Sequence, residues 1–165
     1  MRLGITGHRG LTEDVEHVVR TALGTVVREY AGDDLVGVSC LADGPDAWFA
    51  QEILRNGGRI EAVLPAEEYR ESLPGSHHPL YDDLVRRSSQ VHTTGLIQPG
   101  PEAYQIGNEI MMGLVDILVA VWDGRPARGY GGTADAVSYA HRTGLPVRVI
   151  WPQGAARDAT SAGRP

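Results

Sequence analysis

The chain has 165 residues, a net charge of −6 and 42% hydrophobic residues, which is enough for one soluble domain with a sizeable core. The negative charge disfavours binding to duplex nucleic acid, because such binders usually present a basic face. No run of about 18 apolar residues predicts a transmembrane helix, and the N-terminus lacks the apolar region of a signal peptide. We therefore expect a cytoplasmic protein with no membrane partner.

Few side chains of this chain are suited to covalent or metal chemistry. All 15 basic residues are arginine, which excludes a lysine that binds phosphate in a P-loop, forms a Schiff base or acts as a general base. Cys40 is the only cysteine, which excludes an internal disulfide and a multi-cysteine zinc site, and we expect its thiol to be buried. The six histidines have no metal-ligand spacing, so we predict no metal site.

Segments with strand periodicity and helix periodicity alternate along the chain. Strand-like segments, most of them apolar, predict strands over residues 3–6, 35–41, 60–64, 90–94, 117–122 and 147–151. Helical periodicity and stop signals predict helices over residues 12–30, 43–57, 80–88, 104–115 and 133–142. The stretch 65–101 is rich in proline and glycine and less regular, which is typical of the wall of a cleft.

This alternation predicts an α/β fold of one domain, with a mainly parallel sheet and helices on both of its faces. The domain is expected to cover residues 1–152, and residues 153–165 are expected to form a disordered tail. In such sheets, ligands bind beyond the carboxyl ends of the strands. The loops that follow Thr6, Leu41 and Trp122 therefore belong to one predicted edge.

A glycine-rich loop between the fifth expected strand and the helix that starts at Thr133 is the strongest indication of a ligand. Backbone N–H groups at the start of a helix have no intrahelical partner, and Gly131 and Gly132 let a phosphate approach them closely. Arg125 and Arg128 are candidates to cover that phosphate. The alternative is a simple turn with solvated arginines.

The loop after the first expected strand contains Gly7, His8 and Arg9. Gly7 offers a backbone donor to a phosphate, Arg9 adds a charge-assisted hydrogen bond, and His8 can bond a sugar or a base. The alternatives are a glycine-rich turn with Arg9 in water, and a structural or exposed His8. The pattern differs from the GxGxxG dinucleotide fingerprint.

Two further segments carry candidate ligand contacts. Asp43 and Gly44 lie just before a helix, where Asp43 and Asp46 either cap the helix or recognise a ribose hydroxyl. Asn108 lies on the helix before the fifth strand and can both donate to and accept from a ligand. Glu109 is a possible acid or base, and the alternative is an exposed helical glutamate.

Together these residues resemble the SLOG superfamily, which groups DNA-processing DprA-like proteins with the LOG phosphoribohydrolases. The resemblance covers nearly all of residues 1–152, and the order of its motifs is most similar to the YpsA-like branch. The motifs are Gly4-Ile-Thr-Gly-His-Arg9, Ser39-Cys-Leu-Ala-Asp-Gly-Pro-Asp46, Asn108-Glu-Ile-Met-Met-Gly-Leu-Val-Asp116, Leu118-Val-Ala-Val-Trp-Asp-Gly124 and Gly131-Gly-Thr133. The resemblance implies a Rossmann-like fold that binds an AMP-like or ADP-ribose-like ligand, requires no cofactor and forms a homodimer or larger homo-oligomer.

LOG enzymes cleave the N-glycosidic bond of nucleoside monophosphates with a Pro-Gly-Gly-x-Gly-Thr-x-x-Glu motif and an arginine on the preceding helix. This chain has Ala136 at the glutamate position, Asp135 one position short, and Gly107 or Asn108 at the arginine position. A shift of one residue turns a helical side chain by about 100°. Glu109 and Asp135 therefore remain as the catalytic candidates, in place of the family's own residues.

The sequence thus predicts binding of a nucleotide or nucleotide-derived small molecule, with no assigned biological role. A LOG-like N-glycosidase acting on a nucleoside monophosphate is the alternative function. A DprA-like binder of single-stranded DNA is a third class, which the acidic composition and the single phenylalanine disfavour.

Overall fold

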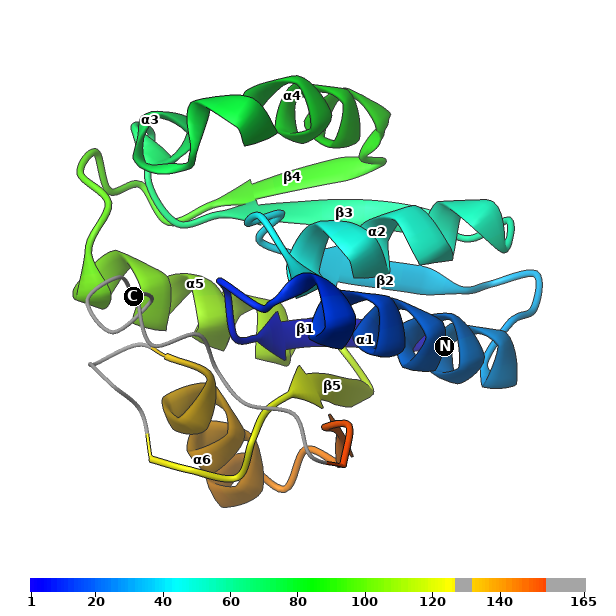
Figure 1. Ribbon diagram of the computed structural model, residues 1–165. Helices are drawn as coiled ribbons and strands as arrows, with labels where there is room; N and C mark the ends of the chain where they lie inside the picture. Colours follow the sequence, from blue (N-terminus) through cyan, green and yellow to red (C-terminus); the bar gives the residue numbers. More distant parts are fainter. Residues whose placement is uncertain (127–131, 154–165) are drawn as a thin grey trace.

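The computed structural model describes residues 1–126 and 132–153 (Figure 1). The strands are β1 (Arg2–Gly7), β2 (Val36–Ser39), β3 (Arg59–Leu64), β4 (Gln90–Thr93), β5 (Ile117–Val121) and β6 (Val147–Ile150). The α-helices are α1 (Glu13–Glu29), α2 (Pro45–Arg55), α3 (Tyr69–Ser72), α4 (His78–Arg87), α5 (Pro101–Gly113) and α6 (Thr133–Thr143), and a 3₁₀ turn covers Gly75–His77. Residues 154–165 of the expected tail lie outside the described residues.

The six strands form one parallel sheet in the order β4-β3-β2-β1-β5-β6. Helices α1 and α2 cover one face and α5 and α6 the other, while α4 packs against α2 (Figure 1). The predicted α/β fold with a Rossmann-like parallel sheet is thereby confirmed. The chain runs outward from β1 to β4 and then returns to β5 on the other side of β1, so the strand order reverses between β1 and β5.

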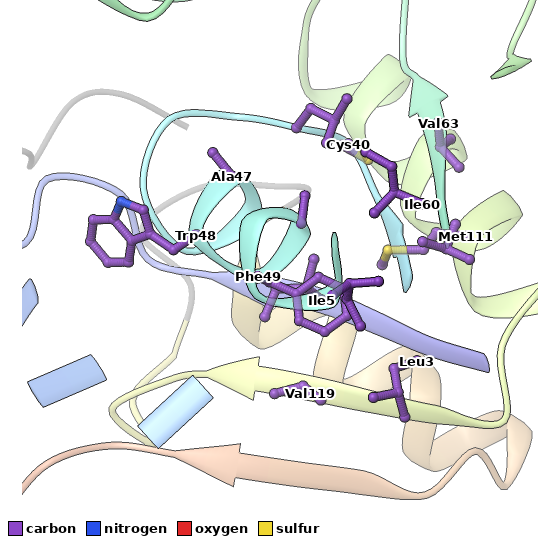
Figure 2. Close-up of a cluster of buried hydrophobic side chains, with 14 of the residues drawn as sticks. Leu3, Ile5, Cys40, Ala47, Trp48, Phe49, Ile60, Val63, Met111 and Val119 are labelled. Carbon is purple, nitrogen blue, oxygen red and sulfur yellow. The ribbon is translucent and has the colours of Figure 1, made fainter. Parts of the chain in front are cut away.

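The core lies where the central strands meet α2 (Figure 2). Leu3 and Ile5 of β1 and Val119 of β5 are exposed by 1% or less, and Phe49 of α2 is fully buried with them. Burial of each large apolar side chain stabilises the fold by about 1.5–3 kcal/mol. Cys40 belongs to the same cluster, so the prediction that its thiol is buried is confirmed. This packing fixes the positions from which the loops after β1 and β5 leave the sheet.

The element boundaries differ from the sequence-based prediction by a few residues, and two of these differences have a clear physical reason. β2 ends at Ser39 and not at Leu41, because Leu41 has a left-handed backbone (φ 59°) and its N–H donates to Ser39 Oγ at 3.0 Å. α5 begins at Pro101, ahead of the expected start at residue 104, since proline fits the first turn of a helix. Thr12 occupies the N-cap position of α1, but its side chain makes no capping hydrogen bond.

The stretch between β3 and α5 contains α3 and a 3₁₀ turn in addition to the one short helix that the sequence predicted. His77 ties this stretch to the loop after β2, because its Nε2 donates to the carbonyl oxygen of Leu41 at 2.9 Å in a buried position. The stretch is therefore packed against the carboxyl edge of the sheet. Within residues 1–126 and 132–153, no helix is both long enough and apolar enough to cross a membrane.

Candidate functional site

The carboxyl ends of β1 and β5 define the most favourable position for a ligand in this sheet. β1 and β5 are neighbours, and Gly7 at the end of β1 is in register with Val121 at the end of β5. The strand order reverses at this pair, so the chain continues from β1 to α1 and from β5 to α6 in opposite directions. Parallel sheets bind ligands in the crevice that such a reversal leaves between the two loops.

Gly7 brings the loop after β1 directly onto the start of α2. A Cβ atom at Gly7 would lie 2.7 Å from Cβ of Pro45 and 3.0 Å from Cβ of Val121, closer than side chains tolerate. Only glycine therefore allows β1, β5 and the first turn of α2 to approach this closely. The sequence predicts that Gly7 contacts a phosphate, and the structure shows that Gly7 has a packing role.

Arg9 and Asp43 join the loop after β1 to the loop after β2. Nη2 of Arg9 lies 2.5 Å from Oδ1 of Asp43, a charge contact without the alignment of a hydrogen bond. Gly44 continues this loop with φ 94°, a conformation that favours glycine, and a Cβ there would lie 3.9 Å from the Arg9 Cα. These three candidate residues therefore lie together, and Arg9 is not a solvated turn residue.

Gly44 is the N-cap of α2, and Asp46 lies in the first turn of that helix, where the helix dipole favours a carboxylate. Asp46 also lies near Arg9 and Asp43, and the Ala42 backbone hydrogen-bonds its carboxylate. Burial raises the pKa of Asp46 to about 7, although the Ala42 hydrogen bond and the Arg9 charge oppose this change. Asp46 is therefore able to exchange a proton near neutral pH.

His8 bridges β1 and β5 across the point where the strand order reverses. Its Nε2 lies 3.1 Å from Oδ1 of Asp123, and its backbone N–H donates to the carbonyl oxygen of Val121 at 3.1 Å. The side chains of His8 and Asp123 are exposed by only 9% and 8%, and Trp151 contacts the imidazole edge-on at 5.7 Å between ring centroids. His8 is thus a buried bridging residue and not an exposed loop histidine.

Sequence reasoning did not assign a site role to Asp123. Its Oδ1 also accepts the backbone N–H of Arg125 at 3.0 Å, which shapes the loop after β5. Arg125 itself is exposed. The available signal was the position of Asp123 just beyond a fully apolar strand, where polar side chains reach the carboxyl edge of a parallel sheet.

The remaining candidates lie on the opposite face, on α5 and α6, which pack against each other. A Cβ at Gly107 would lie 3.3 Å from Pro65, just beyond β3, so the adjacent Asn108 lies near the carboxyl edge. Gly132 is the N-cap of α6 and Thr133 its first residue, and α6 packs against β1 and β5. Gly131 and Arg128 lie outside the described residues.

The two catalytic candidates occupy different environments. Glu109 is half-buried and accepts a hydrogen bond from Nε2 of Gln105 at 2.8 Å, so it is not a freely exposed glutamate. Asp135 lies in the first turn of α6 and is half-buried. Ala136, at the position of the LOG glutamate, is fully buried, so that side chain position faces the protein interior.

The described residues contain no group of three or more His, Cys, Asp or Glu side chains placed to hold a metal ion. Burial and the nearby Asp46 charge raise the pKa of the Cys40 thiol, which disfavours the thiolate that nucleophilic chemistry requires. Among the described residues, the site therefore offers backbone donors, Arg9 and several carboxyl groups.

No protein-family model matches the chain, and no curated protein matches it at a significant level. Solved structures do match. DprA from Streptococcus pneumoniae is 22% identical with a TM-score of 0.65, over 90% of this chain and 50% of that one. DprA from Helicobacter pylori, described with a single-stranded DNA binding mode, is 17% identical with a TM-score of 0.71, over 95% and 68%.

A molybdenum cofactor binding protein from Rippkaea orientalis is 16% identical with a TM-score of 0.60, over 92% of this chain and 77% of that one. The chain spans about half the length of the Streptococcus DprA chain that it matches. These similarities, each below 25% identity, show a fold shared with DprA proteins and with a molybdenum cofactor binding protein.

Proposed function

We propose that this protein binds a nucleotide or nucleotide-derived small molecule at the carboxyl edge of its sheet, between the loops that follow β1 and β5. The observation that carries this proposal is the reversal of strand order at β1 and β5, because this is where parallel sheets bind ligands. Gly7, His8, Arg9, Asp43 and Gly44 lie around that edge.

The proposed ligand carries both phosphate and hydroxyl groups. Arg9 and the N-terminus of α6 at Gly132 and Thr133 supply positive charge or backbone donors for a phosphate. Asp43 and Asp123 supply acceptors for hydroxyl or amino groups. This mixture of charges fits a nucleoside monophosphate or ADP-ribose better than inorganic phosphate, which would be repelled by the carboxylates.

The proposal also includes the domain organisation and the cellular setting. Residues 1–152 form the nucleotide-binding domain, the protein acts in the cytoplasm, and two or more copies associate. Size-exclusion chromatography with light scattering tests the association, and a mass of one chain at micromolar concentration would contradict it.

An N-glycosidase is the alternative function, since the fold resembles that of the LOG enzymes. Ala136 cannot supply an acid, so Glu109 on α5 and Asp135 on α6 remain the candidate catalytic carboxylates. Oxocarbenium-like transition states require a well-placed carboxylate pair or an equivalent charge. Incubation with AMP and chromatography for free adenine distinguishes an enzyme from a binding protein.

Single-stranded DNA binding is favoured by one observation, the fold shared with the Helicobacter DprA. The net charge of −6 and the single phenylalanine disfavour it, because such sites combine a basic groove with aromatic stacking. Retention of a labelled oligonucleotide on a filter at moderate salt would support this function. Absence of retention would leave the small-molecule ligand.

Thermal-shift measurements with AMP, ADP-ribose, NAD and cyclic nucleotides test the main proposal. A ligand at 100 times its dissociation constant stabilises the folded state by about 2.7 kcal/mol. Arg9→Gln should weaken the response, whereas Arg55→Gln, which removes a surface arginine paired with Glu52 at the far end of α2, should not. The absence of any shift at millimolar concentrations would contradict the proposal.

A further inference from the structure

Gln105 of α5 holds a buried polar atom that the fold leaves unsatisfied. The residue is only 8% exposed. Its Oε1 has no hydrogen-bond partner within the part of the chain that the structure describes. Buried side-chain oxygens in folded proteins are nearly always hydrogen-bonded, and one that is not lowers stability by about 1–3 kcal/mol. Gln105 therefore requires an explanation that the fold alone does not provide.

Glu109 determines which end of the Gln105 amide remains without a partner. Nε2 of Gln105 donates to Oε1 of Glu109 at 2.8 Å. A carboxylate accepts hydrogen bonds and cannot donate them, so the reversed amide would set two oxygens against each other. The unpartnered group is therefore the carbonyl oxygen, an acceptor that matches a donor on another molecule.

The helix geometry places Gln105 on the flank of α5 that lies opposite Gly107. Residues two positions apart lie about 200° apart around a helix. Gly107 packs against Pro65 beside β3, so the Gln105 side chain leaves α5 on the flank turned away from Pro65. Asn108 and Glu109 lie closer to that flank, at three and four residues beyond Gln105. Gln105 is therefore a neighbour on α5 of two residues of the candidate site.

We propose that Oε1 of Gln105 accepts a hydrogen bond from an exocyclic N–H of the base or from the ribose 2′-hydroxyl of the bound nucleotide. This inference rests on the proposed nucleotide function and identifies one specificity residue of that site. The oxygen is fully covered in the described structure, so a ligand reaches it only when covering side chains shift. Satisfying the buried acceptor offsets part of the free energy that this opening requires.

The variant Gln105→Met keeps the length of the side chain and removes both polar atoms. If the oxygen is reserved for a ligand, the ligand-free variant should melt at a temperature about 2–4 °C above the wild type. Its affinity for AMP in titration calorimetry should fall by about 5- to 100-fold. If Gln105 had only a structural role, the ligand-free Gln105→Met variant would melt below the wild type. That result would overturn the proposal.

Gln98→Met is the matched control, because Nε2 of Gln98 also donates to a glutamate, Glu68, at 2.7 Å but on an exposed surface. This variant should change neither the melting temperature of the free protein nor the affinity for AMP. Comparable effects of the two substitutions would overturn the assignment to Gln105.

Two AMP analogues identify the donor. If the base amine donates, the penalty of Gln105→Met disappears with purine riboside 5′-monophosphate. If the 2′-hydroxyl donates, it disappears with 2′-deoxy-AMP. A penalty that is absent with AMP, or equal for all three probes, overturns the inference while the nucleotide function stands. A wild type that binds none of the three contradicts the nucleotide function itself, and the inference with it.

Discussion

The imidazole of His8 and the carboxylate of Asp123 meet at 3.1 Å across the only pair of strands at which the described sheet reverses its order. Each residue lies just beyond its strand, and both side chains are more than nine-tenths buried. The backbone N–H of Asp123 also approaches Nε2 of His8, at 3.3 Å. This contact holds the two loops together at the base of the proposed ligand site.

Replacing His8 tests how much this bridge stabilises the protein. His8→Phe preserves the ring packing against Trp151 but removes the nitrogen that faces Asp123. Because the Asp123 carboxylate loses a polar partner in a buried position, we expect the free energy of unfolding to fall by about 1–3 kcal/mol in urea denaturation. His141→Phe, on an exposed site of α6, is the control, and equal losses for the two variants would contradict the bridging role.

The close approach at Gly7 predicts a specific sensitivity to a methyl group. Gly7→Ala places a Cβ 2.7 Å from Pro45, so the start of α2 must move away from β1, at a cost of about 1–3 kcal/mol. Gly32→Ala meets no atom within 4 Å and should change the stability by less than about 1 kcal/mol. Thermal denaturation of both variants checks this, and a fully stable Gly7→Ala variant would refute the close packing.

The carboxyl group of Asp46 predicts a loss of stability as the pH rises. Its pKa in the folded protein, about 7, lies above its ordinary value of 3.8, so the folded state holds the proton more tightly than the unfolded chain. This contribution is complete below pH 3.8 and is lost between about pH 4 and pH 7. Asp46→Asn should therefore gain stability relative to the wild type by about 1.4 kcal/mol for each pH unit across that window.

Urea denaturation at several pH values from 4.5 to 8 measures this difference. Asp33→Asn, in an exposed loop, serves as the control. Its free energy of unfolding should change with pH in the same way as that of the wild type. If the stability difference between Asp46→Asn and the wild type does not change with pH, the Asp46 carboxyl is not perturbed as described.

A second charged cluster predicts a pH effect of the opposite sign. Two nitrogens of Arg2 donate to the carboxylate of the buried Glu61 at 2.8 and 3.1 Å, and His92 lies 2.9 Å from it. The hydrogen bonds from Arg2 are the main reason that the pKa of Glu61 lies below its ordinary value of 4.5. The resulting stability is present above pH 4.5 and is lost as the pH falls through the lowered pKa.

Arg2→Met should lower the free energy of unfolding at pH 7 by about 1–3 kcal/mol and reduce the loss of stability below pH 4.5. Arg86→Met removes an exposed arginine paired with Asp83 and should cost less than about 1 kcal/mol. An acid-denaturation curve for Arg2→Met that is parallel to the wild-type curve would show that Arg2 does not perturb Glu61.

The fold was predictable because its signals are local and repeated. Most strands of the parallel sheet are short apolar runs, and the longer helices have their own periodicity and stop residues, as at Gly57 and Gly144. The left-handed conformation of Leu41 was not predictable, because a leucine rarely adopts it. The hydrogen bond between His77 Nε2 and the Leu41 carbonyl oxygen, which fixes this loop, comes from a residue far along the chain.

The candidate site was predictable as a set of loops but not as a set of contacts. The rule that ligands bind at carboxyl ends correctly joined Arg9 to Asp43, which lie on successive loops. The contact between His8 and Asp123 was not predictable from the sequence, because the two residues lie 115 positions apart. Gln105 carries no local signal, because only the packed structure shows that its oxygen is buried without a partner.

Mapping of backbone amide shifts by NMR during titration with AMP tests the central claim most directly. We expect the largest changes at residues 7–10, 43–46, 123–125 and 132–134, which lie at the carboxyl edge around β1 and β5. The start of β3 at Arg59 and the end of α2 at Arg55 should stay unchanged. Changes confined to the amino edge of the sheet or to β4, or no changes at millimolar AMP, would contradict a nucleotide site where the strand order reverses.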